Sequence, residues 1–166
     1  MAFDPRKLTV KASEAIQKSQ ALAERSQHRI LRPLHLLKAL LEEESGIMKQ
    51  LMQKMGVNIA QLQKMIDGEF QRLPQSAGTG DEPVGVGTEA GKVLTAAQKQ
   101  AESMGDEYTS TEHLLLALTQ VEDQAKRLLH LNGVEQADIL EALKTVRGGQ
   151  TVQDQNPEDK YQALEK

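Results

Sequence analysis

The 166-residue sequence contains no cysteine and no tryptophan, and it has only two tyrosines and two phenylalanines. Without cysteine the chain has no disulfide, no zinc–thiolate site and no thiol nucleophile. Because aromatic residues make up only 2% of the sequence, a hydrophobic core has to be built from Leu, Ala, Ile and Met. Ala, Leu and Met, like Gln, Glu and Lys, lose little conformational freedom in a helix, so the composition favours helices.

Long apolar segments are also missing. The longest uninterrupted apolar run covers residues 114–118, far short of the roughly 20 residues that cross a bilayer. The first ten residues, MAFDPRKLTV, lack the apolar segment of a secretory signal. A net charge of −4 and an isoelectric point near 5.6 do not favour nucleic-acid binding. We therefore expect a soluble, cytoplasmic protein that has neither a membrane nor a nucleic acid as partner.

One stretch, GVGTEAGKVL at residues 85–94, looks like a phosphate-binding loop. Such a loop requires Gly, four residues and then Gly-Lys-Ser/Thr, between a buried strand and a helix. Here the glycine spacing does not fit, Val93 stands where a magnesium-binding hydroxyl is needed, and no strand is predicted ahead. The pattern instead predicts linker glycines and then a helix that Thr88 caps, with Gly91 and Lys92 inside it.

Signatures of metal binding and nucleophilic catalysis are missing too. His35 and His113 have no partner at metal-ligand spacing, and no Gly-x-Ser-x-Gly motif is present. We expect both histidines in the first turn of a short helix, hydrogen-bonded locally or packed between the two halves. His28 and His130 are expected on the surface.

Three acidic residues, Asp106, Glu107 and Glu112, could form a catalytic carboxylate set. A structural role is the simpler reading of the residues alone. Thr109 to Glu112 fits a capping box, and Asp106 follows Gly105, which is expected to end a helix.

Helix start and stop signals recur along the chain. Asp4 and Pro5 can serve as N-cap and first helical residue, while Ser45 and Asn58 can cap two further helices. With the apolar periodicity, these signals predict eight helices, at about 4–25, 33–43, 46–55, 59–73, 88–104, 111–120, 123–131 and 135–146. The second of them is apolar over most of its circumference and is expected to be central. Met48, Met52 and Met55 on the third are expected to pack in the core.

The chain contains an internal duplication. Residues 74–87 are rich in Gly and Pro and lack a hydrophobic period, which predicts a linker. A shift of 78 residues places LHLLKAL over EHLLLAL, and after a one-residue gap the match continues at a shift of 77. Repeat one then covers about 4–73 and repeat two about 88–146. Since each small unit needs a partner for its apolar stripes, we predict that the repeats pack into one domain over residues 1–146.

The repeated motif [P/T]-[L/E]-H-L-L-x-A-L, each time behind a long amphipathic helix, resembles the N-terminal domain of Clp-type AAA+ chaperones. The resemblance covers essentially the whole chain, and a single helix pattern would not produce the double repeat. The tail, VRGG followed by EDKYQALEK, is similar to the segment that leads into the first ATPase module of the disaggregases in this family. Residues 147–166 are therefore expected to be a linker and the start of a helix, capped by Asn156, leading to an ATPase module that this chain lacks.

The resemblance implies an all-α, pseudo-twofold domain of two tandem four-helix repeats without catalytic activity of its own. It implies that the domain recruits exposed segments of unfolded or aggregated polypeptides for a homohexameric, ATP-driven ring that works with a partner chaperone system. ATP and magnesium are expected in the missing ATPase modules, and no cofactor or metal is expected in this fragment.

The resemblance also assigns substrate-binding residues. Thr9 in KLTVK, Asp106 in MGDEY and Glu112 in TSTEHLL match family positions that lie close together beside an apolar groove between the repeats. Leu94 and Tyr108 are our candidates for the groove wall. Such a wall captures apolar side chains through the hydrophobic effect, and carboxylates at its edge accept hydrogen bonds from backbone N–H groups, Lys or Arg.

A second function stays open, the docking of adaptors or degradation tags on a protease-linked Clp unfoldase. Relatives of that kind tend to carry Glu-His in both repeats, which suits two cation sites. This chain has Leu34-His35 in repeat one and Glu112-His113 only in repeat two. This asymmetry and the tail favour the disaggregase.

Overall fold

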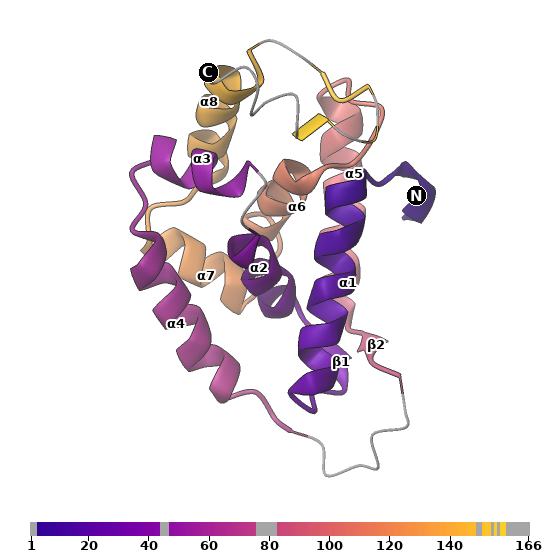
Figure 1. Cartoon of the computed structure of the whole chain (residues 1–166), viewed down its shortest axis with the longest axis vertical. Helices are drawn as coiled ribbons and strands as arrows, with labels where there is room; N and C mark the ends of the chain where they lie inside the picture. Colours follow the sequence, from indigo (N-terminus) through magenta and orange to yellow (C-terminus); the bar gives the residue numbers. More distant parts are fainter. Residues whose placement is uncertain are drawn as a thin grey trace.

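The computed structural model describes residues 3–43, 47–75, 83–148, 151–153, 155 and 157–158. Within these residues the chain forms eight α-helices and very little strand, which confirms the predicted fold class (Figure 1). The helices are α1 (Val10–Arg25), α2 (Pro33–Glu42), α3 (Met48–Lys54), α4 (Ile59–Gln71), α5 (Thr88–Ser103), α6 (Thr111–Leu118), α7 (Gln124–Leu131) and α8 (Gln136–Arg147). A 3-10 helix, η1, covers Pro5–Lys7, and two short strands, β1 and β2, cover Ile30–Leu31 and Gly85–Val86.

The first helix begins later than the sequence predicts. Asp4 caps only the 3-10 turn, and α1 begins at Val10 with Thr9 as its N-cap. The difference arises because Leu8 forms a parallel bridge with Thr109, which requires extended backbone at this point. A contact distant in sequence therefore overrides the local helix signal.

Three other helix starts were also predicted from cap residues. Asn58 caps α4 as predicted, because its Oδ1 accepts a hydrogen bond from the Gln61 N–H at 3.1 Å. The predicted cap at Thr88 is wrong by one residue, since Gly87 is the N-cap of α5 and Thr88 is the first helical residue. Ser45 lies outside the described residues, and the N-cap of α3 is Ile47.

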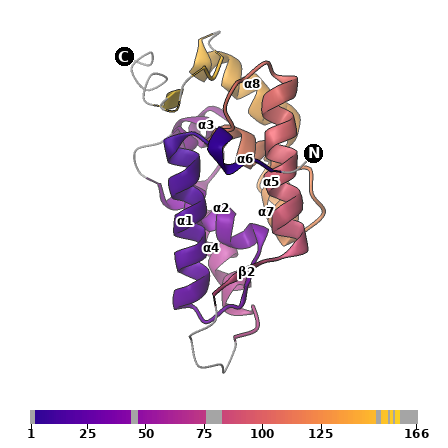
Figure 2. The same cartoon turned by 90° about the vertical axis from the view of Figure 1, so that its right-hand side faces the viewer.

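The two repeats pack around their second helices. Figure 2 shows α1 and α5 on opposite sides, with α2 and α6 between them. Helix α3 contacts α8 and α4 contacts α7, and the duplication exchanges these two pairs. The same exchange relates the α1–α6 contact to the α2–α5 contact, so the packing follows a pseudo-twofold arrangement.

The core is aliphatic, as the composition predicts. All eight residues of α6 and eight of the ten in α2 are buried, which confirms the central position predicted for the helix at 33–43. Met48 and Met52 of α3 are fully buried and Met55 packs against the core, so the core role predicted for the three methionines is also confirmed.

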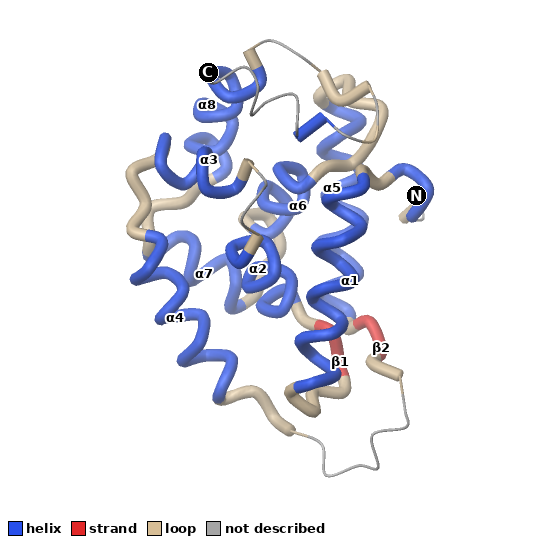
Figure 3. The backbone as a smooth tube through the Cα atoms, in the orientation of Figure 1, coloured by secondary structure: helices blue, strands red, loops and turns tan. Residues whose placement is uncertain are grey.

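The strands join one repeat to the other (Figure 3). β1 and β2 are parallel, with Ile30 opposite Gly85 and Leu31 opposite Val86. Under the 78-residue shift this pairing corresponds to the bridge between Leu8 and Thr109. In both places the residues before the first helix of one repeat pair with the loop before the second helix of the other. The expectation that no strand precedes the GTEAGK stretch is thus wrong, although β2 has only two residues, both exposed.

Gly87 is required where β2 approaches β1. A Cβ added there would lie 2.6 Å from Ile30 Cγ2 and 2.9 Å from the Leu31 carbonyl oxygen, whereas one added at Gly91 would meet no atom within 4 Å. We expect Gly87→Ala to lower the free energy of unfolding by about 1–3 kcal/mol through overpacking. Gly91→Ala, inside α5, is expected to raise it by roughly 0.5–1 kcal/mol. Urea denaturation of both variants checks this, and equal effects would contradict the close approach at Gly87.

Candidate functional site

Thr9, Asp106 and Glu112 meet where repeat one joins repeat two. The N–H of Thr9 donates to the Thr109 carbonyl at 2.9 Å, and the N–H of Thr109 donates to the Lys7 carbonyl at 2.7 Å. This pairing holds the start of α1 against the loop that precedes α6. It brings Thr9 of repeat one close to the acidic residues of repeat two.

Arg147, the last residue of α8, binds both carboxylates. Its Nη1 and Nη2 donate to the two oxygens of Asp106, at 3.2 and 2.9 Å. Its Nε donates to Glu112 Oε2 at 3.1 Å, and Ser110 Oγ donates to Glu112 Oε1. Paired, planar hydrogen bonds of this kind are among the strongest that side chains form. We call Thr9, Asp106, Glu112, His113 and Arg147 the polar junction.

All five side chains of the polar junction are buried. Burial opposes ionisation of Asp106, but hydrogen bonds from His113, from Arg147 and from the Val152 N–H together hold its pKa below the ordinary value. The carboxylate therefore stays charged, and the Arg147 guanidinium supplies the balancing charge. No group of three or more possible metal ligands occurs in the part of the chain that the structure describes.

His113 orients the junction from the first turn of α6. Its Nδ1 accepts the Ser110 N–H at 2.8 Å, so its Nε2 is the donor to Asp106 Oδ2 at 2.7 Å. The capping pair is therefore Ser110 with His113, and the predicted box of Thr109 with Glu112 is wrong by one residue. Glu112 does not cap the helix, and its carboxylate binds Arg147 instead.

Residues after α8 complete this site. The Val152 N–H donates to Asp106 Oδ1 at 2.9 Å, and the Glu107 N–H donates to the Val152 carbonyl at 2.7 Å. Thr9 Oγ1 donates to Glu158 Oε2 at 2.9 Å. Pro157 and Glu158 are helical, as predicted for this segment, while Asn156 lies outside the described residues.

Repeat one carries an equivalent site with different chemistry. The repeat shifts place His28, Leu34, His35 and Phe70 at the positions of Asp106, Glu112, His113 and Arg147. We call these four residues the aromatic junction. Their rings lie together, with Phe70 centroids 4.9 Å from His28 and 5.4 Å from His35.

The histidines of the aromatic junction share a hydrogen bond. His35 Nδ1 accepts the Arg32 N–H at 2.9 Å, so its Nε2 donates to His28 Nδ1 at 2.8 Å. His28 is buried, so the prediction that it lies on the surface is wrong, whereas His130 is exposed as predicted. Burial and the neighbouring His28 lower the pKa of His35 to about 4, and burial likewise lowers the pKa of His28. The duplicated site is thus neutral in repeat one and charged in repeat two.

The two predicted wall residues lie at the edge of the core. Leu94 on α5 and Tyr108, next to the paired Thr109, are half-buried and pack against core side chains. A hollow of about 400 Å³ opens beside Asp106. It is lined by Asp4, Lys7, Gln98, Ala101, Glu102, Asp106, Glu107 and Thr109. Of the five predicted site residues, Asp106 is the one that lines this hollow.

Sequence reasoning missed Arg147 and Glu158 as members of the site. It placed both in the tail beyond the domain, although the 77-residue shift sets Arg147 opposite Phe70 near the end of α4. That correspondence was available as a signal. The sequence carries no comparable signal for Glu158.

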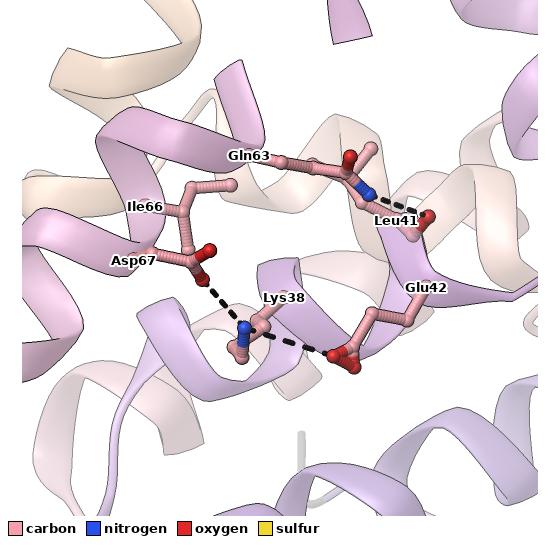
Figure 4. Close-up of a pocket in the computed structure, with 6 residues that line it drawn as sticks. All are labelled: Lys38, Leu41, Glu42, Gln63, Ile66 and Asp67. Atoms are coloured by element: carbon pink, nitrogen blue, oxygen red, sulfur yellow. Dashed lines mark hydrogen bonds and ion pairs between the residues drawn. The ribbon is translucent and has the colours of Figure 1, made fainter. Parts of the chain in front are cut away.

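A smaller pocket, of about 220 Å³, lies between α2 and α4 (Figure 4). Lys38 Nζ lies 2.6 Å from Asp67 Oδ1 and 3.6 Å from Glu42 Oε1, and Gln63 Nε2 donates to the Leu41 carbonyl at 3.4 Å. The charged groups of this pocket are therefore paired with one another. They connect α2 to α4 and lie outside the predicted site.

Comparison with known proteins identifies the fold and its relatives. The family model described as "Clp repeat (R) N-terminal domain" matches residues 7–132. A chaperone protein ClpB from Rhodopirellula baltica is 39% identical over 166 residues, all of this chain but 19% of that protein. The ClpB of a Bacillus cereus strain is 37% identical over 99% of this chain and 19% of its own length. The crystal structure of the Hsp104 N-terminal domain from Candida albicans has a TM-score of 0.80 and 25% identity, covering 92% of this chain and 99% of that domain.

Proposed function

Because the chain belongs to the family of Clp repeat N-terminal domains, we propose that it recruits unfolded or aggregated polypeptides for an ATP-driven disaggregase. The chain spans about a fifth of the length of the ClpB chaperones that it matches. In this proposal ATP and magnesium act in the remainder of a longer, homohexameric protein of the cytoplasm, which works with a partner chaperone. This domain contributes no catalysis and holds exposed client segments near the ring. No helix among the described residues is long and apolar enough to cross a membrane.

One observation carries the proposal. Thr9, Asp106 and Glu112 come from different repeats and converge on one junction, where Asp106 accepts the backbone N–H of Val152. Unfolded polypeptides share exposed backbone N–H groups and apolar side chains, and little else. A carboxylate that accepts a backbone N–H suits a binder of varied sequences, and half-buried apolar residues such as Leu94 and Tyr108 can add apolar contacts.

We predict that unfolded β-casein binds at this junction. In a titration followed by amide chemical shifts, the resonances of Thr9, Leu94, Asp106, Tyr108 and Glu112 should move together and saturate, because the client contacts this surface. Shift changes confined to α3 and α7 would place the client elsewhere and contradict the proposal.

A matched pair of leucine variants sharpens this experiment. Leu94→Gln is expected to weaken casein binding about three- to tenfold, through the loss of roughly 1 kcal/mol of apolar contact. Leu131→Gln is the control, because Leu131 is 67% exposed and lines a separate hollow on α7. Equal affinity of both variants would exclude Leu94 from the binding surface.

The aromatic junction bears on the alternative function, the docking of cationic tags or adaptors at two equivalent sites. In repeat one the positions of the two carboxylates and the arginine are taken by His28, Leu34 and Phe70. The remaining member, His35, has a pKa of about 4. A neutral side-chain cluster of this kind offers no carboxylate to a cation. We therefore retain recruitment of unfolded polypeptides as the proposed function.

A further inference from the structure

The segment after α8 contacts Thr9 and Asp106, two of the residues that the proposed function assigns to clients. The backbone of its described residues makes three hydrogen bonds with the domain. The Val152 N–H donates to Asp106 Oδ1, the Val152 carbonyl accepts from the Glu107 N–H, and the Gln155 carbonyl accepts from the Val10 N–H at 2.9 Å. Hydrogen bonds of this kind do not depend on the side chains of the segment, so another extended polypeptide can form them.

The Val152 and Glu158 side chains of the segment are fully buried against the domain. Val152 joins the hydrophobic core cluster, and Glu158 lies against Thr9 and the start of α6. The Thr111 N–H faces Glu158 Oε2 at 3.4 Å. The segment thus presents a backbone N–H, an apolar side chain and a carboxyl group, the last at the N-terminal end of α6.

We propose that the described part of this segment, residues 151–153, 155 and 157–158, is a resident occupant of the client site, and that an extended client with an apolar residue in place of Val152 has to displace it. The inference rests on the proposed function. Val152 already uses an oxygen of Asp106, and Glu158 already accepts from the Thr9 hydroxyl. Segment and client therefore cannot make the same contacts together. A client binds only molecules in which the site is free. Its apparent affinity is therefore the intrinsic affinity multiplied by the fraction of such molecules.

The contact is built so that it can be released. Glu158 Oε1 and Thr111 Oγ1 are buried without a hydrogen-bond partner, which costs free energy in the docked state. Burial and the neighbouring Glu112 also raise the pKa of Glu158 to about 7. Because this pKa is raised on docking, the contribution of Glu158 is complete below pH 4.5 and is lost as the pH rises through 7. Near neutral pH the contact of Glu158 with the domain is therefore weakened, which makes the segment easier for a client to displace.

Two aspartate substitutions in the full chain test the inference. Val152→Asp removes the buried aliphatic group and should release the segment, while Gln153→Asp adds the same charge at the adjacent, exposed position. We expect Val152→Asp to raise the affinity for fluorescein-labelled β-casein about five- to tenfold, as the loss of one buried valine would give. Gln153→Asp should leave the affinity unchanged. Hydrogen exchange at the Val10 and Glu107 amides reports release without any client, since both donate to the segment.

The possible results separate the two proposals. Faster exchange at both amides in Val152→Asp, with casein affinity unchanged or lower, overturns the resident occupant and leaves the proposed function intact. Unchanged exchange in Val152→Asp overturns it as well, because the segment would then be held by other contacts. Failure of casein to bind either the original chain or the released variant contradicts the proposed function, and the occupant falls with it.

Discussion

Replacement of Arg147 by alanine is expected to lower the free energy of unfolding by about 3–5 kcal/mol. The guanidinium is the cation that lies between Asp106 and Glu112, and both carboxylates are buried. Without it, two negative charges remain in the interior close to each other. Removal of one partner from a buried ion pair costs much more than the pair itself contributes, because the remaining charge has lost its hydration.

Thermal and urea unfolding measure this effect, which corresponds to a fall of roughly 10 °C in the melting temperature for a domain of this size. Lys144→Ala is the control on the same helix, because the Lys144 side chain is 77% exposed and pairs only with Glu141 among the ion pairs that the described residues form. It should change stability by less than about 1 kcal/mol. A similar small effect of Arg147→Ala would mean that the two carboxylates find water once the guanidinium is gone.

The duplication supplies a further control for Arg147. Asp106→His, Glu112→Leu and Arg147→Phe together give the polar junction the side chains of the aromatic junction. We expect this triple variant to recover to within about 2 kcal/mol of the original chain, since well-packed apolar groups can replace a buried ionic cluster. Stability as low as that of Arg147→Ala alone would show that the two junctions differ in shape as well as in charge.

Acidification from pH 7 to pH 4 is expected to remove about 3 kcal/mol of stability through His35. The pKa of His35 is about 4 in the folded domain and 6.5 in an unfolded chain. Between these values the unfolded state binds more protons than the folded state, so stability is complete above pH 6.5 and falls as the pH drops towards 4. The cause is burial beside His28, which leaves no room for a second charge.

A comparison of variants isolates this contribution, because carboxylates titrate in the same range. His35→Gln keeps an oxygen that can accept the Arg32 N–H, as a glutamine at this helix position does in a capping box. The stability difference between this variant and the original chain should shrink by about 3 kcal/mol between pH 7 and pH 4. Parallel pH profiles for the original chain and His35→Gln would assign the acid sensitivity to other groups.

Most of the helices could be predicted from the sequence because their signals are local. The period of the apolar residues and the Asn58 cap identify elements that tertiary contacts then leave in place. The errors lie where a distant contact decides the backbone. Leu8 and Thr9 are extended because they meet the loop before α6, and Ser110 rather than Thr109 caps α6 because His113 turns back to its N–H.

Part of the candidate site could be predicted as well. The resemblance of the repeated motif to a known family pointed to Thr9, Asp106 and Glu112, and the structure brings these three residues together. Their assignment to client binding stays a prediction, as do the wall roles of Leu94 and Tyr108. Glu158 could not be assigned from composition or periodicity, because an ionic group in a tail is usually solvated. For Arg147 the sequence signal was its correspondence with Phe70 in the first repeat.

By itself, the sequence determined an all-α chain of two similar four-helix units, because helix periodicity and duplication are recorded in the order of the residues. Only the tertiary structure decided that one copy of the duplicated junction is charged and the other neutral in its folded surroundings. It also decided that the segment beyond α8 contacts Asp106 and Thr9 of the polar junction. The reason is that the free energy of a buried charge depends on which groups lie within a few ångströms of it. For Asp106 those groups come from positions 113, 147 and 152, and Thr9 reaches the same place from the other repeat.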